Sequence, residues 1–120
     1  YNRGLAYRAK GDTDRAIADY SKAIEINPQS ALAYYNRGLA YRAKGDTDRA
    51  FADYSKALEI NPKDAYAHYH LAEARERLGQ IEDALKSFAQ AVSLNPLDSY
   101  AQFNLGRLLD KLGRSYKVIH

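Results

Sequence analysis

The amino-acid sequence repeats itself with a period of 34 residues. Residues 35–68 match the first 34 residues at 28 positions. The same frame continues more loosely through 69–102, and a partial fourth copy follows at 103–120. A period of 20–50 residues is typical of stacked units that cannot bury their apolar faces alone. The sequence therefore predicts an array of structural repeats.

Turn-forming residues divide each copy into two helices. In the second copy, Ser30 is placed to cap a first helix and Gly45 to end it in a left-handed conformation. Asp46 can cap a second helix, which Asn61-Pro62 ends because proline disfavours a helical residue before it. Asp64 and Asp98 occupy the cap position before the next two first helices. Since the connections are short, consecutive helices must pack antiparallel.

These boundaries predict one all-α domain. Its expected parts are a truncated first repeat over 1–30, repeats over 31–64 and 65–98, and a last helix over 99–112 with a tail to residue 120. Because the chain begins with tyrosine rather than methionine, we expect a fragment of a longer protein. No apolar run approaches the ~20 residues needed to cross a bilayer, and we expect no membrane partner. Cysteine is absent, which excludes disulfides and leaves the compartment open, with the cytoplasm slightly favoured.

The distribution of charge argues against nucleic-acid binding. The formal net charge is +3, but residues 103–120 alone hold four basic and one acidic residue. Elsewhere the charges alternate in sign, as on a solvated helix surface, whereas nucleic-acid binding usually requires basic residues clustered on one face. An RNA-binding helical array is therefore only a third hypothesis.

Catalytic and metal-binding patterns are missing from the sequence. It contains no glycine-rich phosphate loop, H-E-x-x-H or G-x-S-x-G motif. His68 and His70 are two residues apart on a helix, so they point to different faces and are poor partners for a metal. Asp12 and Asp14 lack the further ligands of a calcium loop and are better explained as caps. We expect no enzyme, no cofactor and no metal.

A 34-residue helix-turn-helix with these residues resembles the tetratricopeptide repeat family. The motif positions of the second copy hold Tyr34, Arg37-Gly38, Tyr41, Ala50, Tyr54, Ala57 and Pro62, and those of the third hold His68, Leu71-Ala72, Arg75, Ala84, Phe88, Ala91 and Pro96. The resemblance implies a right-handed superhelical solenoid of antiparallel helix-turn-helix repeats. Arg37 replaces the usual leucine and Arg75 an aromatic residue, and we expect their guanidinium groups to reach solvent or a neighbouring carboxylate.

The resemblance also implies a function and a site. In the family, the first helices of successive repeats line a concave groove that holds peptide segments of partner proteins, without catalysis. The corresponding residues here are Asn2, Leu5, Arg8, Tyr35, Asn36, Leu39, Arg42, Tyr66, Tyr69, His70, Glu73, Tyr100, Asn104 and Arg107. An asparagine side chain can pair with both the N–H and the C=O of a peptide, and aromatic rings supply contact area. Tyr35 and Tyr69 can equally pack between neighbouring helices.

Two further hypotheses concern the partner. The family includes a clamp for carboxyl-terminal peptides of heat-shock chaperones, built from lysine, asparagine, asparagine, lysine and arginine. The corresponding residues here are Tyr1, Leu5, Asn36, Tyr66 and His70, and the single match argues against that ligand. Near-identical repeats are also suited to stacking end to end, which would give an open homo-oligomer. Self-assembly is therefore the second hypothesis for the function.

Overall fold

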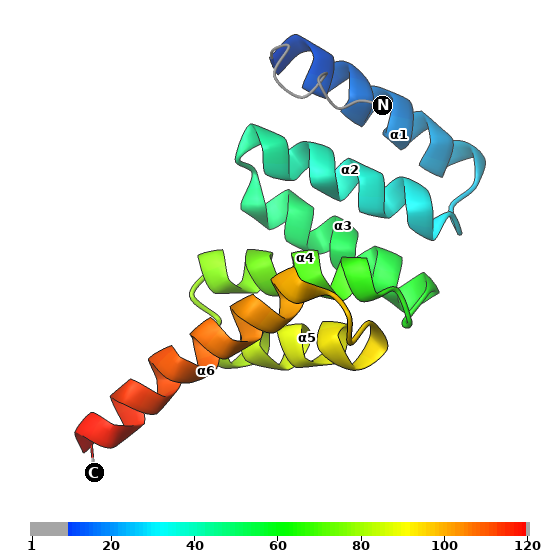
Figure 1. Ribbon diagram of the computed structural model, residues 1–120. Coiled ribbons are helices and arrows are strands. Elements are labelled where there is room, and N and C mark those ends of the chain that lie inside the picture. Colours follow the sequence, from blue (N-terminus) through cyan, green and yellow to red (C-terminus); the bar gives the residue numbers. More distant parts are fainter. Residues whose placement is uncertain (1–9, 120) are drawn as a thin grey trace. The chain divides into compact units, whose positions relative to one another are not determined.

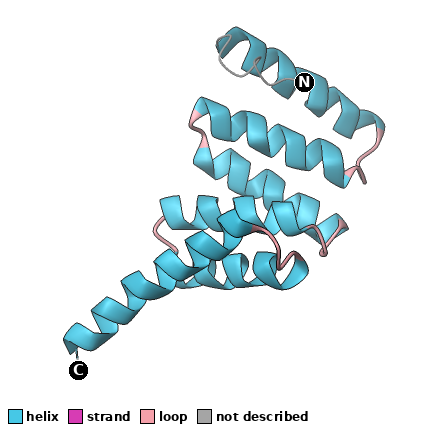
Figure 2. Ribbon diagram, viewed as in Figure 1, coloured by secondary structure: helices cyan, strands magenta, loops and turns pink. Residues whose placement is uncertain are grey.

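The computed structural model describes residues 10–119, which form six helices joined by short turns and contain no strand (Figure 2). The predicted all-α fold is confirmed. The chain divides into two compact units, Tyr1–Pro62 and Lys63–His120, and each is described by itself. The predicted groove residues Asn2, Leu5 and Arg8 lie outside the described residues.

Unit 1 contains α1 (Lys10–Ile26), α2 (Ala31–Lys44) and α3 (Thr47–Ile60) (Figure 1). Helix α2 packs against both α1 and α3. Only Gly45 and Asp46 separate α2 from α3, so α3 returns antiparallel to α2. Helices α2 and α3 together form the predicted helix-turn-helix.

The predicted caps of unit 1 are present. The amide of Ala33 donates to Ser30 Oγ at 3.2 Å, and the amide of Arg49 donates to Asp46 Oδ1 at 3.1 Å. Gly45 has a φ of 85°, a conformation that glycine adopts without a steric penalty. Local residues thus fix the start of α2 and the turn between α2 and α3.

Unit 2 contains α4 (Ala65–Arg77), α5 (Ile81–Leu94) and α6 (Ser99–Ile119). Helix α5 packs against α4 and α6. Asp64 Oδ1 accepts the amides of Tyr66 and Ala67, so it caps α4 as predicted. Asp98 Oδ1 caps α6 in the same way, through the amides of Tyr100 and Ala101. The two carboxylates therefore have equivalent positions, one at the start of each first helix.

One helix boundary and two expected caps differ from the prediction. The last helix was expected over 99–112, but α6 continues to Ile119. Gly113 does not adopt a positive φ, and no proline follows it, so nothing in the local sequence ends the helix there. Asp12 and Asp14 were expected to act as caps, but both lie inside α1. The Asp12 carboxylate lies 3.7 Å from Arg15 Nη1.

Small residues allow the two helices of a repeat to approach closely. In unit 1, Tyr54 is 1% exposed, and its ring lies against buried Gly38. A Cβ atom on Gly38 would lie 2.6 Å from a carbon of that ring. In unit 2, Phe88 packs in a buried cluster with Ala72 and Leu108. Each repeat therefore places one aromatic ring against one small residue of the partner helix.

Gly106 occupies the same repeat position as Gly38 but does not pack against an aromatic ring as Gly38 does. It lies 68 residues after Gly38, yet a Cβ atom there would meet nothing within 4 Å. No second helix packs on this side of α6 in the described part of the chain. The repeat equivalent of Gly38 consequently faces open space.

The two arginines that depart from the motif reach carboxylates, as expected. Arg37 binds Asp53 through two bonds of 2.8 Å and also donates to Ser21 Oγ at 3.1 Å. Asp53 is only 4% exposed, and its hydrogen bonds raise the pKa of Arg37 above the ordinary arginine value. Because Ser21 lies in α1 and Asp53 in α3, Arg37 links all three helices of unit 1. In unit 2, Arg75 Nη1 lies 3.7 Å from Asp83 Oδ2.

The contrast between the two glycines gives a stability prediction. Gly38→Ala forces a methyl group into the ring of Tyr54, and we expect it to lower the free energy of unfolding by about 1–3 kcal/mol. Gly106→Ala adds the same methyl group in open space and removes the flexibility of glycine, so it should raise stability by up to about 1 kcal/mol. Urea denaturation of both variants measures the effect. Equal stability of the two variants would contradict the packing.

Candidate functional site

A surface hollow of about 540 Å³ lies in unit 2, between the start of α4 and the loop that leads into α6. Its lining residues are Tyr66, Tyr69, His70, Asn95, Leu97, Asp98, Ser99 and Tyr100. Four of the predicted groove residues meet there: Tyr66, Tyr69, His70 and Tyr100. Tyr66 is 58% exposed and Tyr100 73% exposed. Such exposed aromatic surface suits a binding role.

Tyr69 packs in the core of unit 2 and also lines the hollow. Its ring packs edge-on against Phe88 in the core, with centroids 5.7 Å apart. The ring also packs edge-on against the imidazole of His70, with centroids 5.1 Å apart. The Tyr69 hydroxyl accepts a hydrogen bond of 3.1 Å from the side-chain amide of Asn104. Tyr69 therefore connects the core of unit 2 to the floor of the hollow.

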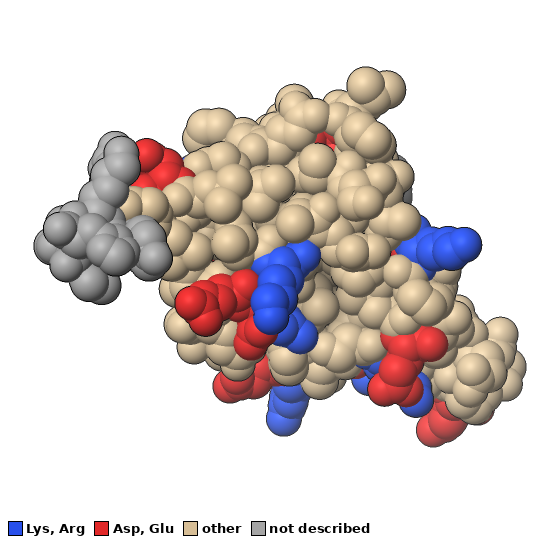
Figure 3. All heavy atoms as spheres, turned by 90° about the horizontal axis from the view of Figure 1, so that it is seen from below, with Lys and Arg blue, Asp and Glu red and all other residues tan. Residues whose placement is uncertain are grey.

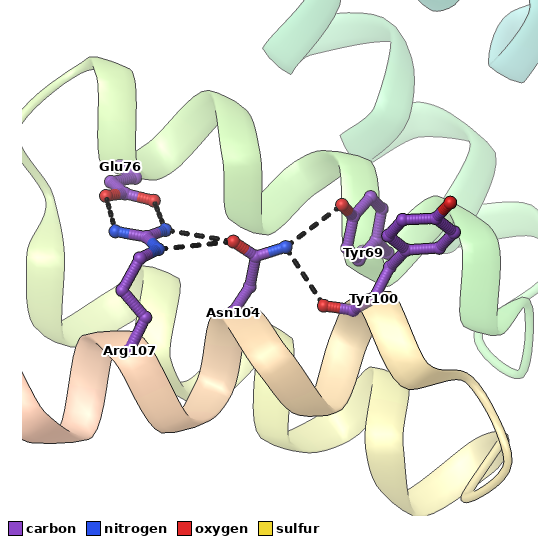
Figure 4. A network of polar contacts seen from close by, with 5 residues as sticks. All are labelled: Tyr69, Glu76, Tyr100, Asn104 and Arg107. Carbon is purple, nitrogen blue, oxygen red and sulfur yellow. Dashed lines mark hydrogen bonds and ion pairs between the residues drawn. The ribbon is translucent and has the colours of Figure 1, made fainter.

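A line of polar contacts joins α4 to α6 beside the hollow (Figure 4). The amide nitrogen of Asn104 donates to Tyr69 Oη and to the carbonyl of Tyr100, at 3.1 and 3.0 Å. Its amide oxygen accepts from Arg107, whose guanidinium also binds both carboxylate oxygens of Glu76, at 2.7 and 2.8 Å. The side-chain amide of Asn104 thus makes hydrogen bonds within the protein through both its nitrogen and its oxygen.

The ion pair between Glu76 and Arg107 changes the acidity of both groups. Hydrogen bonds from Arg107 hold the pKa of Glu76 below its ordinary value, and the same bonds raise the pKa of Arg107. A two-pronged pairing of this kind is stronger than a single-contact surface pair. It therefore fixes α6 against α4 and neutralises both charges.

Charges elsewhere on the chain form no single-sign patch in the view drawn. On the face in Figure 3, basic and acidic side chains form small mixed groups, and wide uncharged areas lie between the groups.

In unit 2, His70 Nδ1 lies 3.0 Å from Glu73 Oε1. Since an ionised carboxylate can only accept, Nδ1 carries the hydrogen in this contact.

The four predicted residues of unit 1 that the structure describes lie on α2. Tyr35, Asn36 and Leu39 are half-buried, and Arg42 is exposed. The Tyr35 ring centroid lies 6.1 Å from that of Tyr54, so part of this ring packs inward. Their role in binding stays a prediction.

The sequence prediction missed the loop side of the hollow. Asp98 was interpreted only as a cap, and Asn95 and Leu97 were not among the predicted site residues. Leu97 is 92% exposed and occupies a position where the earlier copies have Gln29 and Lys63. An apolar residue in place of two polar ones was the available signal.

Family models confirm the repeat pattern. A model described as "TPR repeat" matches residues 4–41 and 38–79, and one described as "Tetratricopeptide repeat" matches residues 69–115. The chain belongs to the tetratricopeptide repeat family. Members of this family are generally non-catalytic modules for protein–protein interaction. No curated protein matches the chain.

Solved structures of tetratricopeptide repeats have the same fold. The Arabidopsis OM64 TPR domain is 30% identical, with a TM-score of 0.78, covering 82% of this chain and 81% of that one. MamA is 26% identical with a TM-score of 0.81, covering 94% and 66%. The first TPR of Spaghetti (RPAP3), bound to the HSP90 peptide SRMEEVD, is 26% identical with a TM-score of 0.82, covering 86% and 82%.

Among the residues that the structure describes, no group of three or more histidine, cysteine or acidic side chains lies together as a metal site would require. None of the helices within residues 10–119 is both long and apolar enough to span a membrane.

The ion pair predicts a pH-dependent coupling. Because the pKa of Glu76 is lowered by folding, the pair stabilises the protein above the ordinary glutamate pKa and loses this effect as pH falls through the lowered value. A double-mutant cycle of Glu76→Gln and Arg107→Ala should give a coupling energy of up to about 1 kcal/mol at pH 7, since Arg107 is partly exposed. Measured by urea denaturation, the coupling should decline between about pH 5 and pH 2. Coupling that is constant over this range would contradict the pairing.

Proposed function

We propose that this tetratricopeptide repeat protein is a non-catalytic module that binds a peptide segment of a partner protein, with the hollow of unit 2 as its main contact. The observation that carries the proposal is the exposed aromatic surface at Tyr66 and Tyr100, next to polar groups of the same hollow. Aromatic side chains give large contact area and lose little conformational entropy when they bind.

Rigid support beneath the hollow favours the same function. Tyr69 is anchored on Phe88, and the contacts of Asn104 and Arg107 hold α6 in place. A preformed surface binds more tightly, because less ordering is needed on association. In this proposal Asn104 and Arg107 position the site, while Tyr66, Tyr100 and His70 contact the peptide.

A solved relative supports a peptide as the class of ligand. The first TPR of Spaghetti (RPAP3) was solved with an HSP90 peptide. The ligand itself should differ, because Tyr66 and His70 of this chain occupy positions where the chaperone clamp has lysine and arginine. Tyr35, Asn36, Leu39 and Arg42 on α2 are proposed as a separate binding surface of unit 1.

Selection from a random peptide library tests this function. We expect enriched peptides to bind the wild type, and Tyr66→Ala/Tyr100→Ala to weaken them by at least about tenfold, since aromatic hot spots contribute about 1 kcal/mol or more each. Leu109→Ala is the matched control, because Leu109 is exposed on α6 but does not line the hollow. A Tyr35→Ala/Asn36→Ala pair tests the surface proposed on α2. Equal affinities for the wild type and the Tyr66/Tyr100 variant would contradict the proposal.

Self-association is a second candidate, favoured by the surface around Gly106. The equivalent Gly38 is covered by the Tyr54 ring, whereas Gly106 faces open space and Leu109 nearby is 51% exposed. A helix of a second copy that places an aromatic ring on Gly106 would repeat the packing seen in unit 1. An unclosed contact of this kind generates filaments.

Light scattering over a concentration series distinguishes the two candidates. A peptide receptor keeps a constant molecular mass. Self-association through α6 predicts a mass that rises with concentration in the wild type and stays constant in Gly106→Lys, whose side chain would fill the contact. A rise that persists in Gly106→Lys would exclude this surface.

A further inference from the structure

We infer that the hollow of unit 2 selects a positively charged side chain, lysine or arginine, presented by a peptide with apolar neighbours. This inference rests on the proposed function and adds the chemical class of the ligand. It comes from the charges, the hydrogen-bond acceptors and the ring surfaces that line the hollow.

The lining of the hollow contains the carboxylate of Asp98 and one imidazole, that of His70, whose Nδ1 lies 3.0 Å from Glu73 Oε1. Its members are three tyrosines, His70, Asn95, Leu97, Ser99 and Asp98, so no lysine or arginine is present among the described lining residues. Arg107 lies nearby but is held by both oxygens of Glu76. A ligand anion would find no unpaired cation at this site, whereas a ligand cation would find Asp98.

The carboxylate of Asp98 has room for a further partner. Both of its hydrogen bonds, from the amides of Tyr100 and Ala101, go to Oδ1. Within the described part of the chain, Oδ2 accepts no hydrogen bond. An ionised carboxylate offers about four acceptor positions. A lysine ammonium or an arginine guanidinium can therefore bind Oδ2 without displacing the cap.

The start of α6 does not turn the hollow into an anion site. Helix N-termini attract anions through their unpaired amides and the helix dipole. Here the amides of Tyr100 and Ala101 are already bonded to Asp98, so the attraction is satisfied within the chain. The remaining electrostatic preference is for a cation.

The walls of the hollow suit the carbon chain of a basic residue. Tyr66, Tyr100 and Leu97 are exposed by 58%, 73% and 92%. Lysine and arginine carry apolar stems that pack on such surface while the charged head reaches a polar group. A cation over an exposed tyrosine face gains about 0.5–1 kcal/mol. Ring surface and carboxylate thus favour the same side chain.

Three fluorescein-labelled peptides test the inference. They share one apolar nine-residue frame and differ only at the central position, which is lysine, norleucine or glutamate. Norleucine keeps the four-carbon stem of lysine and lacks the charge. By fluorescence polarisation at low salt, we expect the lysine peptide to bind the wild type roughly three- to tenfold more tightly than the norleucine peptide. The glutamate peptide should bind most weakly.

Two cap variants locate the effect. Asp98→Asn removes the charge but keeps a good helix cap, because asparagine caps about as well as aspartate. We expect the advantage of lysine over norleucine to fall below about twofold in this variant. Asp64→Asn is the matched control, since Asp64 caps α4 with the same two bonds and does not line the hollow. It should keep the full advantage of lysine.

Each contrary result has a distinct meaning. Equal binding of the lysine and norleucine peptides to the wild type would overturn the cation preference and leave the peptide-binding function standing. A lysine advantage that survives Asp98→Asn would overturn the role of this carboxylate. Tightest binding of the glutamate peptide would assign the hollow to an anion. If none of the three peptides binds the folded protein, both the inference and the hollow as a peptide site are overturned.

Discussion

The close approach of two helices across a small residue is the contact on which the rest of the structure depends. Tyr54 fills the space that Gly38 leaves open, and Phe88 packs with Ala72 in the same manner. Each ring fills the apolar space between the two helices of its pair. This packing fixes the rotation of the first helix about its own axis. The opposite side of the first helix, which carries Tyr66 and His70 in unit 2, is thereby directed outward.

Polar contacts then determine which parts of that outer surface remain available. Asn104 and Arg107 are positioned like ligand-binding residues, but their hydrogen-bonding groups are engaged by Tyr69 and Glu76. The rings of Tyr66 and Tyr100 remain exposed, and Oδ2 of Asp98 remains available to accept a hydrogen bond. In the proposed function, the rings and the loop before α6 therefore contact the peptide, and Asn104 has a supporting role.

The sequence predicted most of the fold because helix ends are encoded locally. Ser30, Gly45 and Asp46 each act through a bond to a residue close in sequence, so their roles could be inferred from residue type alone. The site was predicted only in part. The pair of Glu76 and Arg107 arises where the copies diverge, since the second copy has Arg42 and Leu39 at the corresponding positions. An interpretation based on the residues that the copies share overlooks such a pair. It overlooks the apolar Leu97 for the same reason.

Intermolecular nuclear Overhauser effects test the central claim most directly, because they report which side chains touch a bound peptide. The measurement uses the protein with one library-selected peptide and assigns the ring protons of Tyr66 and Tyr100. We predict cross-peaks from the methyl groups of the peptide to both rings, and to the side chain of Leu97. Cross-peaks confined to the outward side of α5, with none to these rings, would contradict it.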